Sequence, residues 1–166
     1  MNLPTELLSI RDFNYAIHKR WMARAVELAR AAGDAGEVPV GAVIVDGTGK
    51  LIAESQNRRE GDCDPTAHAE ILALRAAGKV LQDWHLNQCT LYVTLEPCPM
   101  CAGAIVQARI GLLVYGADDP KTGTIRTAAN IPDSAPSCHR LEVLGGIMES
   151  VCRDQLLSWF ESRRKI

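Results

Sequence analysis

The chain of 166 residues is long enough for one domain with a hydrophobic core and too short for two comfortable ones. Hydrophobic residues make up 47% and charged residues 23%, values that exclude a disordered or low-complexity protein. The formal net charge of −2 excludes a uniformly basic protein that coats nucleic acid, but not one with a local basic patch. No apolar run approaches the ~18 residues needed to cross a bilayer, and the N-terminal segment lacks the apolar stretch of a signal peptide. We therefore expect a single domain over residues 1–166 that is soluble, cytoplasmic and without a membrane partner.

The first half of the chain predicts a helix followed by a β-hairpin. Residues 1–12 carry no clear period, and we expect them to form a poorly ordered arm. From Asn14 to Gly33 apolar residues recur at helical spacing, which predicts a helix with one face packed on a sheet. The short apolar run at residues 40–45 predicts a buried strand that turns into a partner at residues 51–55.

The second half alternates predicted helices and strands. Asp64, Pro65 and Thr66 predict an N-cap, a first-turn proline and the start of a helix that runs to Gly78. The later elements are a strand at 90–95, a helix at 99–108, a strand at 112–116, a long loop, a strand at 141–144 and a last helical stripe from 148 to 160. This order predicts an α/β fold, in which helices cover both faces of a mixed sheet and parallel strands are joined by right-handed crossovers.

Two short segments carry side chains suited to binding a metal ion. Cys98 and Cys101 form a Cys-x-x-Cys pair at one expected helix start, where free N–H groups favour thiolates, and His68 lies at another. Because six cysteines without an export signal are better interpreted as thiols or ligands than as a disulfide framework, these three residues predict a zinc site. Three protein ligands leave the fourth tetrahedral position for water, whose pKa falls to about 7 on zinc.

Glu70 is the candidate proton carrier beside this site. Positions i and i+2 of an ideal helix point about 200° apart, so Glu70 and His68 can face one point only if His68 lies at the helix tip. A carboxylate that is near the metal but not bound to it can pass a proton from water to a leaving amine. That is the chemistry needed for hydrolytic removal of an exocyclic amino group.

Other interpretations of these residues are open at this stage. The Cys-x-x-Cys pair also suits a redox pair, or a closed structural zinc site with a fourth ligand from Cys63, Cys89, Cys138 or Cys152. Those four cysteines are otherwise expected to be small buried side chains, and His18 and His85 to be solvated or structural. Several large apolar residues at helical spacing are expected in the core: Trp21, Met22, Met148, Trp159 and Phe160. The basic run at 163–165 is by default a solvated helix end.

The joint pattern His-x-Glu followed by Pro-Cys-x-x-Cys is typical of zinc-dependent nucleobase deaminases. Over residues 15–164 the chain further resembles the bacterial tRNA-specific adenosine deaminases of the cytidine deaminase superfamily. The stretches that carry the resemblance are EVPVGA at 37–42, NR at 57–58, DPTAHAE at 64–70, LYVTLEPC at 91–98, CAGA at 101–104 and KTG at 121–123.

This resemblance implies a fold, a reaction and a set of site residues. The fold is cytidine-deaminase-like, with three α/β/α layers and a mixed sheet of about five strands. The implied protein is a homodimer with one zinc per chain, and it converts the wobble adenosine of a tRNA anticodon stem-loop, in bacteria usually that of an arginine tRNA, to inosine. The implied zinc ligands are His68, Cys98 and Cys101, and the implied proton shuttle is Glu70. The implied substrate contacts are Asn57 and Ala69 to the flipped adenine and Asp119 to the flanking nucleotides.

The chain departs from the family pattern at residues 124–138, which lack the usual glycine-serine-leucine-methionine segment, and at Cys138, where asparagine is usual. Contacts to the substrate flanks are the part of the resemblance that these departures affect. A free-purine deaminase of the guanine deaminase type shares the zinc motifs and is the alternative function. A zinc-stabilised binding module without catalysis is disfavoured because Glu70 is in place.

Overall fold

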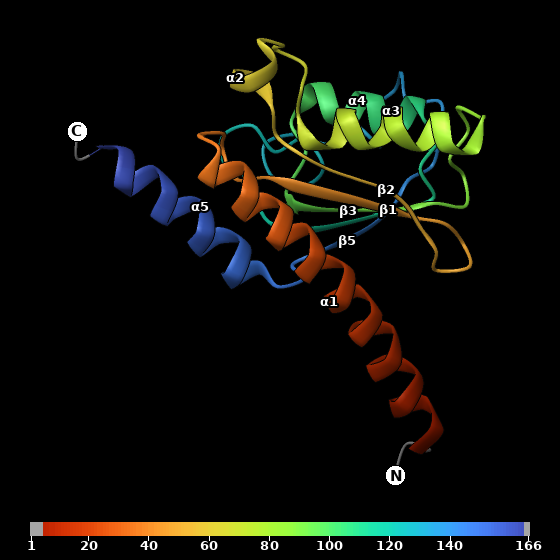
Figure 1. The fold of residues 1–166 in the computed structure, drawn as a ribbon. Coiled ribbons are helices and arrows are strands. Elements are labelled where there is room, and N and C mark those ends of the chain that lie inside the picture. Colours follow the sequence, from red (N-terminus) through yellow and green to blue (C-terminus); the bar gives the residue numbers. More distant parts are fainter. Residues whose placement is uncertain (1–4, 165–166) are drawn as a thin grey trace.

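The computed structural model describes residues 5–164, with side chains from residue 14 onward. Five strands form one mixed sheet with helices on both faces, which confirms the expected three-layer α/β/α fold (Figure 1). The strand order is β2-β1-β3-β4-β5. The strands are β1 (Gly41–Val45), β2 (Leu51–Gln56), β3 (Thr90–Leu95), β4 (Leu112–Ala117) and β5 (Glu142–Gly145).

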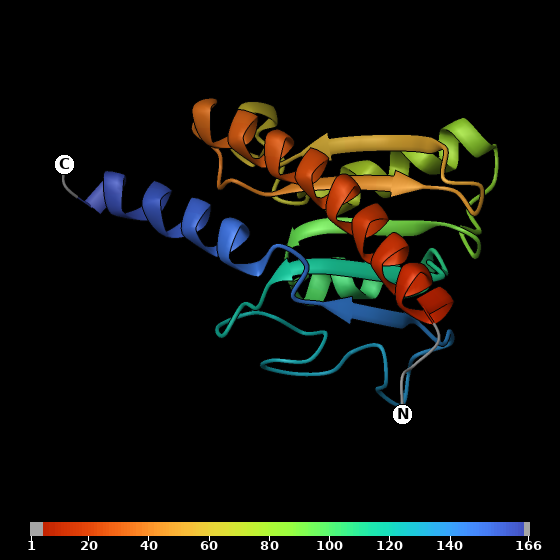
Figure 2. The same ribbon diagram turned by 90° about the horizontal axis from the view of Figure 1, so that it is seen from below.

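The directions of the strands decide where chain segments meet. Strand β1 is antiparallel to both β2 and β3, which confirms the expected hairpin, whereas β3, β4 and β5 are parallel to one another. Strands β2 and β3 therefore run in the same direction on either side of β1. All strands except β1 end at the same edge of the sheet, which we call the carboxyl edge (Figure 2).

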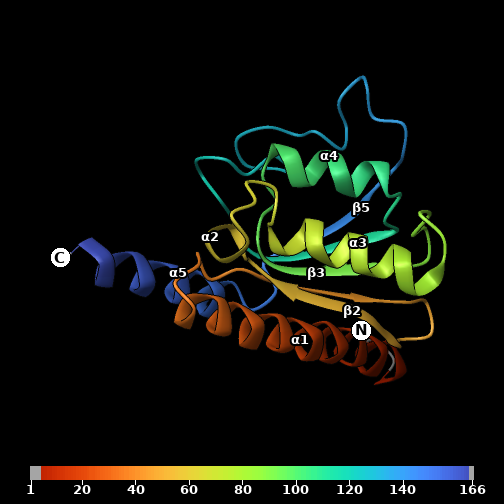
Figure 3. The same ribbon diagram turned by 45° about the horizontal axis from the view of Figure 1, so that its top comes forward.

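Two pairs of helices cover the sheet. Helices α1 (Thr5–Asp34) and α5 (Glu149–Arg164) lie on one face, and α3 (Ala69–Leu81) and α4 (Pro99–Gln107) lie on the other (Figures 1 and 3). A short helix, α2 (Arg59–Asp62), follows β2. Each sheet face buries its own apolar cluster, because the nearly continuous apolar strands β1 and β3 present side chains to both helix layers. No helix in the described part of the chain is both long and apolar enough to cross a membrane.

The first helix begins earlier than its apolar period indicated. Helix α1 starts at Thr5 rather than Asn14 and so takes in residues 5–12 of the expected arm, whereas residues 1–4 of that arm lie outside the described residues. The predicted apolar stripe faces the sheet, and Met22, Ala25 and Ala29 are fully buried. The helix ends one residue after the predicted stop at Gly33.

The predicted start of the second long helix is wrong. One oxygen of the Asp64 carboxylate accepts hydrogen bonds from the Thr66 backbone N–H at 2.8 Å and from its hydroxyl at 2.7 Å, which closes a local turn instead of capping a helix. Helix α3 starts only at Ala69, with His68 as its N-cap residue, and continues past Gly78 to Leu81. Because the chain forms this turn at residues 64–66, α3 begins later in the sequence than predicted, and His68 lies at its N-terminal end.

Some expected core positions are exposed. Cys63 and Cys138 lie at the surface, and Phe160 is 41% exposed, so these three expectations are wrong. Phe160 is exposed because only the first part of α5, with Cys152 and Leu156, packs on the sheet, and the rest extends past the carboxyl edge (Figure 2).

The close approach of Gly41 in β1 to the backbone of α1 generates a prediction about stability. A Cβ atom on Gly41 would lie 2.7 Å from the backbone nitrogen of Ala29 and closer still to the carbonyl oxygen of Ala25. Gly41→Ala should therefore lower the free energy of unfolding by about 1–3 kcal/mol or more, because backbone cannot yield as a side chain can. The matched control is Gly47→Ala, whose nearest atom is 3.5 Å away and whose thermal unfolding should be nearly unchanged. Equal melting temperatures for the two variants would contradict this account of the packing.

Candidate metal centre and substrate pocket

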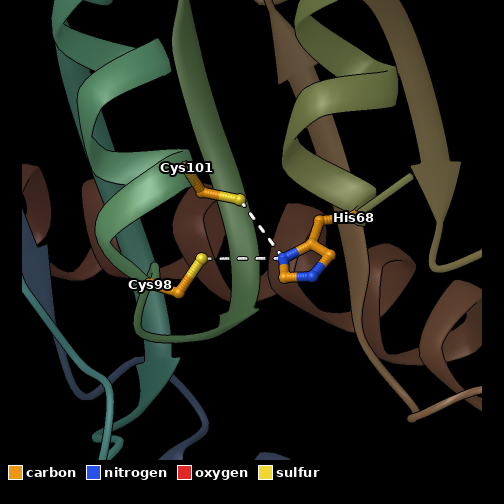
Figure 4. Close-up of side chains that lie close together, drawn as sticks. All are labelled: His68, Cys98 and Cys101. Atoms are coloured by element: carbon orange, nitrogen blue, oxygen red, sulfur yellow. Dashed lines mark hydrogen bonds between the residues drawn. The ribbon is translucent and has the colours of Figure 1, made fainter. Parts of the chain in front are cut away.

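The candidate site lies at the carboxyl edge, where α3 and α4 begin. His68 is the N-cap of α3, Cys98 is the N-cap of α4, and Cys101 lies in the first turn of α4. The three side chains point toward one another across the gap between the two helix tips (Figure 4). Their candidate ligand atoms all lie within 4.8 Å of one another.

The spacing of these atoms fits a tetrahedral metal ion. Nδ1 of His68 lies 3.6 Å from Sγ of Cys98 and 3.5 Å from Sγ of Cys101. A sulfur at ~2.3 Å and a nitrogen at ~2.05 Å from one tetrahedral zinc ion are about 3.5 to 3.6 Å apart. Both nitrogen–sulfur distances therefore fit a metal ion held among the three side chains.

The protonation of the cluster also suits a cation. The neighbouring Cys101 thiol, followed by His68, lowers the pKa of Cys98 to about 4, so this residue is a thiolate at neutral pH. The same interaction with Cys98, together with burial, raises the pKa of Cys101. The hydrogen bond to Cys98 raises the pKa of His68. A bound cation would take the place of the protons shared among these three side chains.

Glu70 is buried beside the cluster, 4% exposed, and does not belong to the three-residue group. Burial raises the pKa of its carboxyl group to about 7. Because His68 precedes the helix and Glu70 lies within its first turn, both side chains reach the same region despite their i, i+2 spacing. A carboxyl group with a pKa near neutrality can both accept and release a proton.

A small pocket of about 110 Å³ opens onto the cluster. Its lining joins the end of β2, the tips of α3 and α4, and the loop after β4, with these residues among others: Asn57, Arg59, His68, Glu70, Cys98, Asp119 and Thr122. Of the residues expected to contact substrate, Asn57 and Asp119 thus lie in its wall.

Asn57 ties two elements of this site together. Its Oδ1 accepts the Ala69 backbone N–H at 2.9 Å, and its Nδ2 donates to the Val38 carbonyl at 3.0 Å. The Ala69 side chain is fully buried. Asn57 therefore holds the start of α3 in place, and the contacts of Asn57 and Ala69 with an adenine base stay predictions.

Two buried carboxylates that the sequence did not single out support the pocket. Glu37 accepts the backbone N–H groups of Glu60 and Gly61, in α2 beside Arg59, at 3.2 and 2.8 Å. Glu96 accepts N–H groups from the loop that contains Asp119. Burial alone would raise the pKa of Glu96, but the Thr127 hydroxyl and these N–H groups lower it below its usual value. Both glutamates stand within quoted motifs, so position alone could have drawn attention to them.

The remaining candidates lie away from the cluster. Within the part of the chain whose side chains are described, no fourth cysteine joins the three-residue group, so a closed structural site finds no support there. His18 bonds the Tyr92 hydroxyl at 2.9 Å, and His85 bonds Asp83 at 2.9 Å, as expected for structural histidines.

Comparison with known proteins agrees with this geometry. The MafB19-like deaminase family model matches residues 16–153. The chain is 47% identical to the tRNA-specific adenosine deaminase of Haemophilus influenzae, over 89% of this chain and 85% of the relative. The chain belongs to the tRNA-specific adenosine deaminase family.

Solved structures of deaminases that act on different substrates share this fold. A structure from studies of A-to-I editing by tRNA:A34 deaminases at the wobble position of transfer RNA matches with a TM-score of 0.80 and 44% identity, covering 82% of this chain and 99% of the other. Guanine deaminase from Nitrosomonas europaea matches with a TM-score of 0.72 and 27% identity, over 85% and 83% of the two chains. The same fold therefore occurs with both kinds of substrate.

The cluster geometry predicts which cysteines hold metal. Cys98→Ser and Cys101→Ser should each lose most of the bound metal and melt at lower temperature, because metal binding stabilises the folded state only. Metal content is measured by elemental analysis of the purified variants. Cys63→Ser, at an exposed cysteine outside the cluster, is the matched control and should keep the wild-type metal content. Full metal occupancy after replacement of both Cys98 and Cys101 would refute the site.

Proposed function

We propose that this protein is a zinc-dependent deaminase that converts the wobble adenosine of a tRNA anticodon to inosine. The observation that carries the proposal is the pairing of the His68–Cys98–Cys101 cluster with the buried carboxyl of Glu70 at one pocket. The identity to tRNA-specific adenosine deaminases supports the choice of substrate.

Zinc is the metal that the donor set favours, because two cysteines and one histidine at tetrahedral spacing are typical zinc ligands. We propose one zinc ion per chain, held by His68, Cys98 and Cys101. When bound there, zinc supplies activation of a water molecule for hydrolysis at neutral pH.

Glu70 moves the proton in this proposal. Its buried carboxyl, with a pKa of about 7, first takes a proton from the attacking water and then donates it to the departing exocyclic amine. The products are inosine and ammonia. Burial in the pocket wall keeps this carboxyl away from bulk water.

The pocket selects an unpaired base. An anticodon loop presents unstacked nucleotides, so turning one base into a pocket costs less there than in a duplex. We propose that Asn57 and the backbone at Ala69 position the adenine, and that Asp119 lies beside the flanking nucleotides. Arg59, which is exposed and also lines the pocket, provides a positive charge for a nearby phosphate.

The basic residues of α5 are suited to the rest of the RNA. Arg163 and Arg164 are exposed near the end of the helix, which projects from the carboxyl edge where the pocket lies (Figures 1 and 2). Arg163 stacks on the Trp159 ring at 4.1 Å, which holds its guanidinium in place. Lys121 and Arg126 are exposed in the loop after β4, and Lys165, the third residue of the basic run, lies outside the described residues.

We further propose a homodimer of single-domain chains that acts in the cytoplasm. A groove of about 740 Å³ between α3 and α4 has a largely apolar lining that includes Leu74, Ala104 and the exposed Trp84. Burial of such a surface against a second copy would stabilise a dimer. Cytoplasmic location follows from the proposed tRNA substrate.

Glu70→Gln separates catalysis from metal binding. The amide keeps the size of the side chain but cannot carry the proton, so turnover should fall by about 10²–10⁴. Metal content should equal that of the wild type, whereas His68→Ala should lose metal. If Glu70→Gln lost metal to the same extent as His68→Ala, Glu70 would be a ligand and the proposed proton path would be wrong.

A comparison of substrates tests the proposed function itself. An anticodon stem-loop with adenosine at the wobble position should be converted to inosine, while free guanine, adenine and cytidine should be poor substrates. Ending the chain after Ser162 should weaken stem-loop binding and flatten its salt dependence by up to ~0.7 log units per lost phosphate contact.

The control for truncation is the double variant Lys19→Gln and Lys50→Gln, which removes exposed charges elsewhere on the surface. Its salt dependence should match the wild type. Rapid turnover of guanine with an inert stem-loop would move the assignment to the free-base deaminases. An unchanged salt slope after truncation would make the basic run only a solvated helix end.

A further inference from the structure

Glu96 is a buried acid that the proposed proton path does not use. It lies between β3 and α4, and only 1% of its surface is exposed. Its Oε1 accepts the backbone N–H groups of Ile125, Arg126 and Thr127 at 3.2, 2.8 and 3.0 Å. Its Oε2 accepts the Asp119 N–H at 3.1 Å and the Thr127 hydroxyl.

These five hydrogen bonds occupy the carboxylate completely. An ionised carboxyl group has about four lone-pair sites, so Glu96 has no acceptor left for a substrate or a water molecule. Glu96 borders the pocket but cannot act there as a base. Its role must be exerted through the residues that donate to it.

All of the donors belong to one segment, residues 119–127, which begins just after β4. This segment supplies Asp119 and Thr122 to the pocket wall. Within it, the Asp119 carboxylate accepts the Thr122 N–H at 3.2 Å and its hydroxyl at 2.6 Å. The neighbouring carbonyl of Pro97 accepts the Thr124 N–H at 3.0 Å, so two successive residues before α4 hold the segment.

The segment is also fitted to the carboxylate from its own side. A Cβ atom on Gly123 would collide with the Glu96 carboxylate and would lie 2.5 Å from the Asp119 carbonyl oxygen. Only a residue without a side chain lets the loop pass this close. The contact therefore depends on Glu96 and Gly123 together.

We infer that Glu96 is a positioning residue, whose carboxylate fixes residues 119–127 as one wall of the pocket and thereby sets how tightly the nucleotides beside the target base are held. The expected effect on substrate binding rests on the proposed function, whereas the effect on the position of residues 119–127 rests on the hydrogen bonds alone. It also places the first residues of the unusual segment 124–138 under the control of Glu96.

Glu96→Gln is the sharpest test. The amide keeps one acceptor oxygen, but its NH₂ group cannot accept the N–H of Asp119, so part of the segment is released. KM for the anticodon stem-loop should rise about 10-fold to 100-fold, as expected for a lost hydrogen bond to a charged group, while kcat changes little. Metal content should stay at the wild-type level.

Hydrogen exchange reports the loop directly and requires no substrate. The backbone amides of residues 119–127 should exchange about 10-fold faster or more in Glu96→Gln, while those of the sheet keep their protection. The matched control is Glu54→Gln, which also removes one carboxylate charge. The Glu54 side chain is partly exposed and forms an ion pair with Arg24. This control should leave KM, metal content and exchange at residues 119–127 unchanged.

Gly123→Ala disrupts the same contact from the loop side and leaves the Glu96 side chain unchanged. This variant should likewise raise KM for the stem-loop and speed hydrogen exchange in residues 119–127. Wild-type exchange in both variants, or loss of metal from Glu96→Gln, would overturn the inference. If the wild-type protein failed to edit the stem-loop, the proposed function would be wrong, and the exchange rates would still decide the role of Glu96.

Discussion

The direction of β1 is the constraint on which the whole site depends. Because β1 is antiparallel to both of its neighbours, β2 and β3 run in parallel and end at one edge of the sheet. Helix α3 follows β2 after the short α2, and α4 follows β3 directly. Both helices lie on the same face and begin at that edge. Residues at two helix tips, His68 and Cys98, are thereby brought within ligand distance although 30 positions separate them in the chain. The helix N-termini also favour the thiolate that a cation requires.

Loops at the carboxyl edge bury backbone N–H groups, and two buried carboxylates offset the free energy that this burial costs. Loops that close a pocket carry backbone N–H groups with no partner in a helix or sheet, and burial of such groups without hydrogen bonds is unfavourable. Glu37 satisfies two of these groups at α2, and Glu96 satisfies four in the loop after β4. A carboxylate is suited to this task because one side chain accepts several donors from consecutive residues. The pocket walls are therefore fixed by side chains that perform no chemistry.

Much of the fold could be predicted from sequence because its signals are local. The hairpin, the apolar strand at 90–95 and the helix opened by Pro99 each follow from patterns within a few residues, and the cysteine spacing indicated the cluster. What could not be predicted depends on distant partners. The Asp64 turn imitates a helix cap in sequence, and α2, with four residues, has no period to detect. The motif around Glu96 marks its position, but its role as an acceptor depends on residues 119–127, which are distant in the sequence.

The separation between a rigid framework and variable loops explains how one fold can act on different bases. The proposed zinc ligands and proton carrier stand at helix tips, where the sheet fixes their geometry, while Asn57 and Asp119, the proposed substrate contacts of the pocket wall, lie in loops. Guanine deaminase from Nitrosomonas europaea has the same fold at 27% identity, as expected if the loops and not the framework distinguish substrates. In this chain the residues that donate to Glu96 extend only as far as Thr127, and none of residues 128–138 donates a hydrogen bond to it. The start of that stretch is held instead by backbone hydrogen bonds, from the N–H groups of Ala128 and Ala129 to the Gly123 carbonyl and from that of Ile131 to the Thr124 carbonyl. Because backbone groups make these bonds, they do not depend on which side chains the stretch carries.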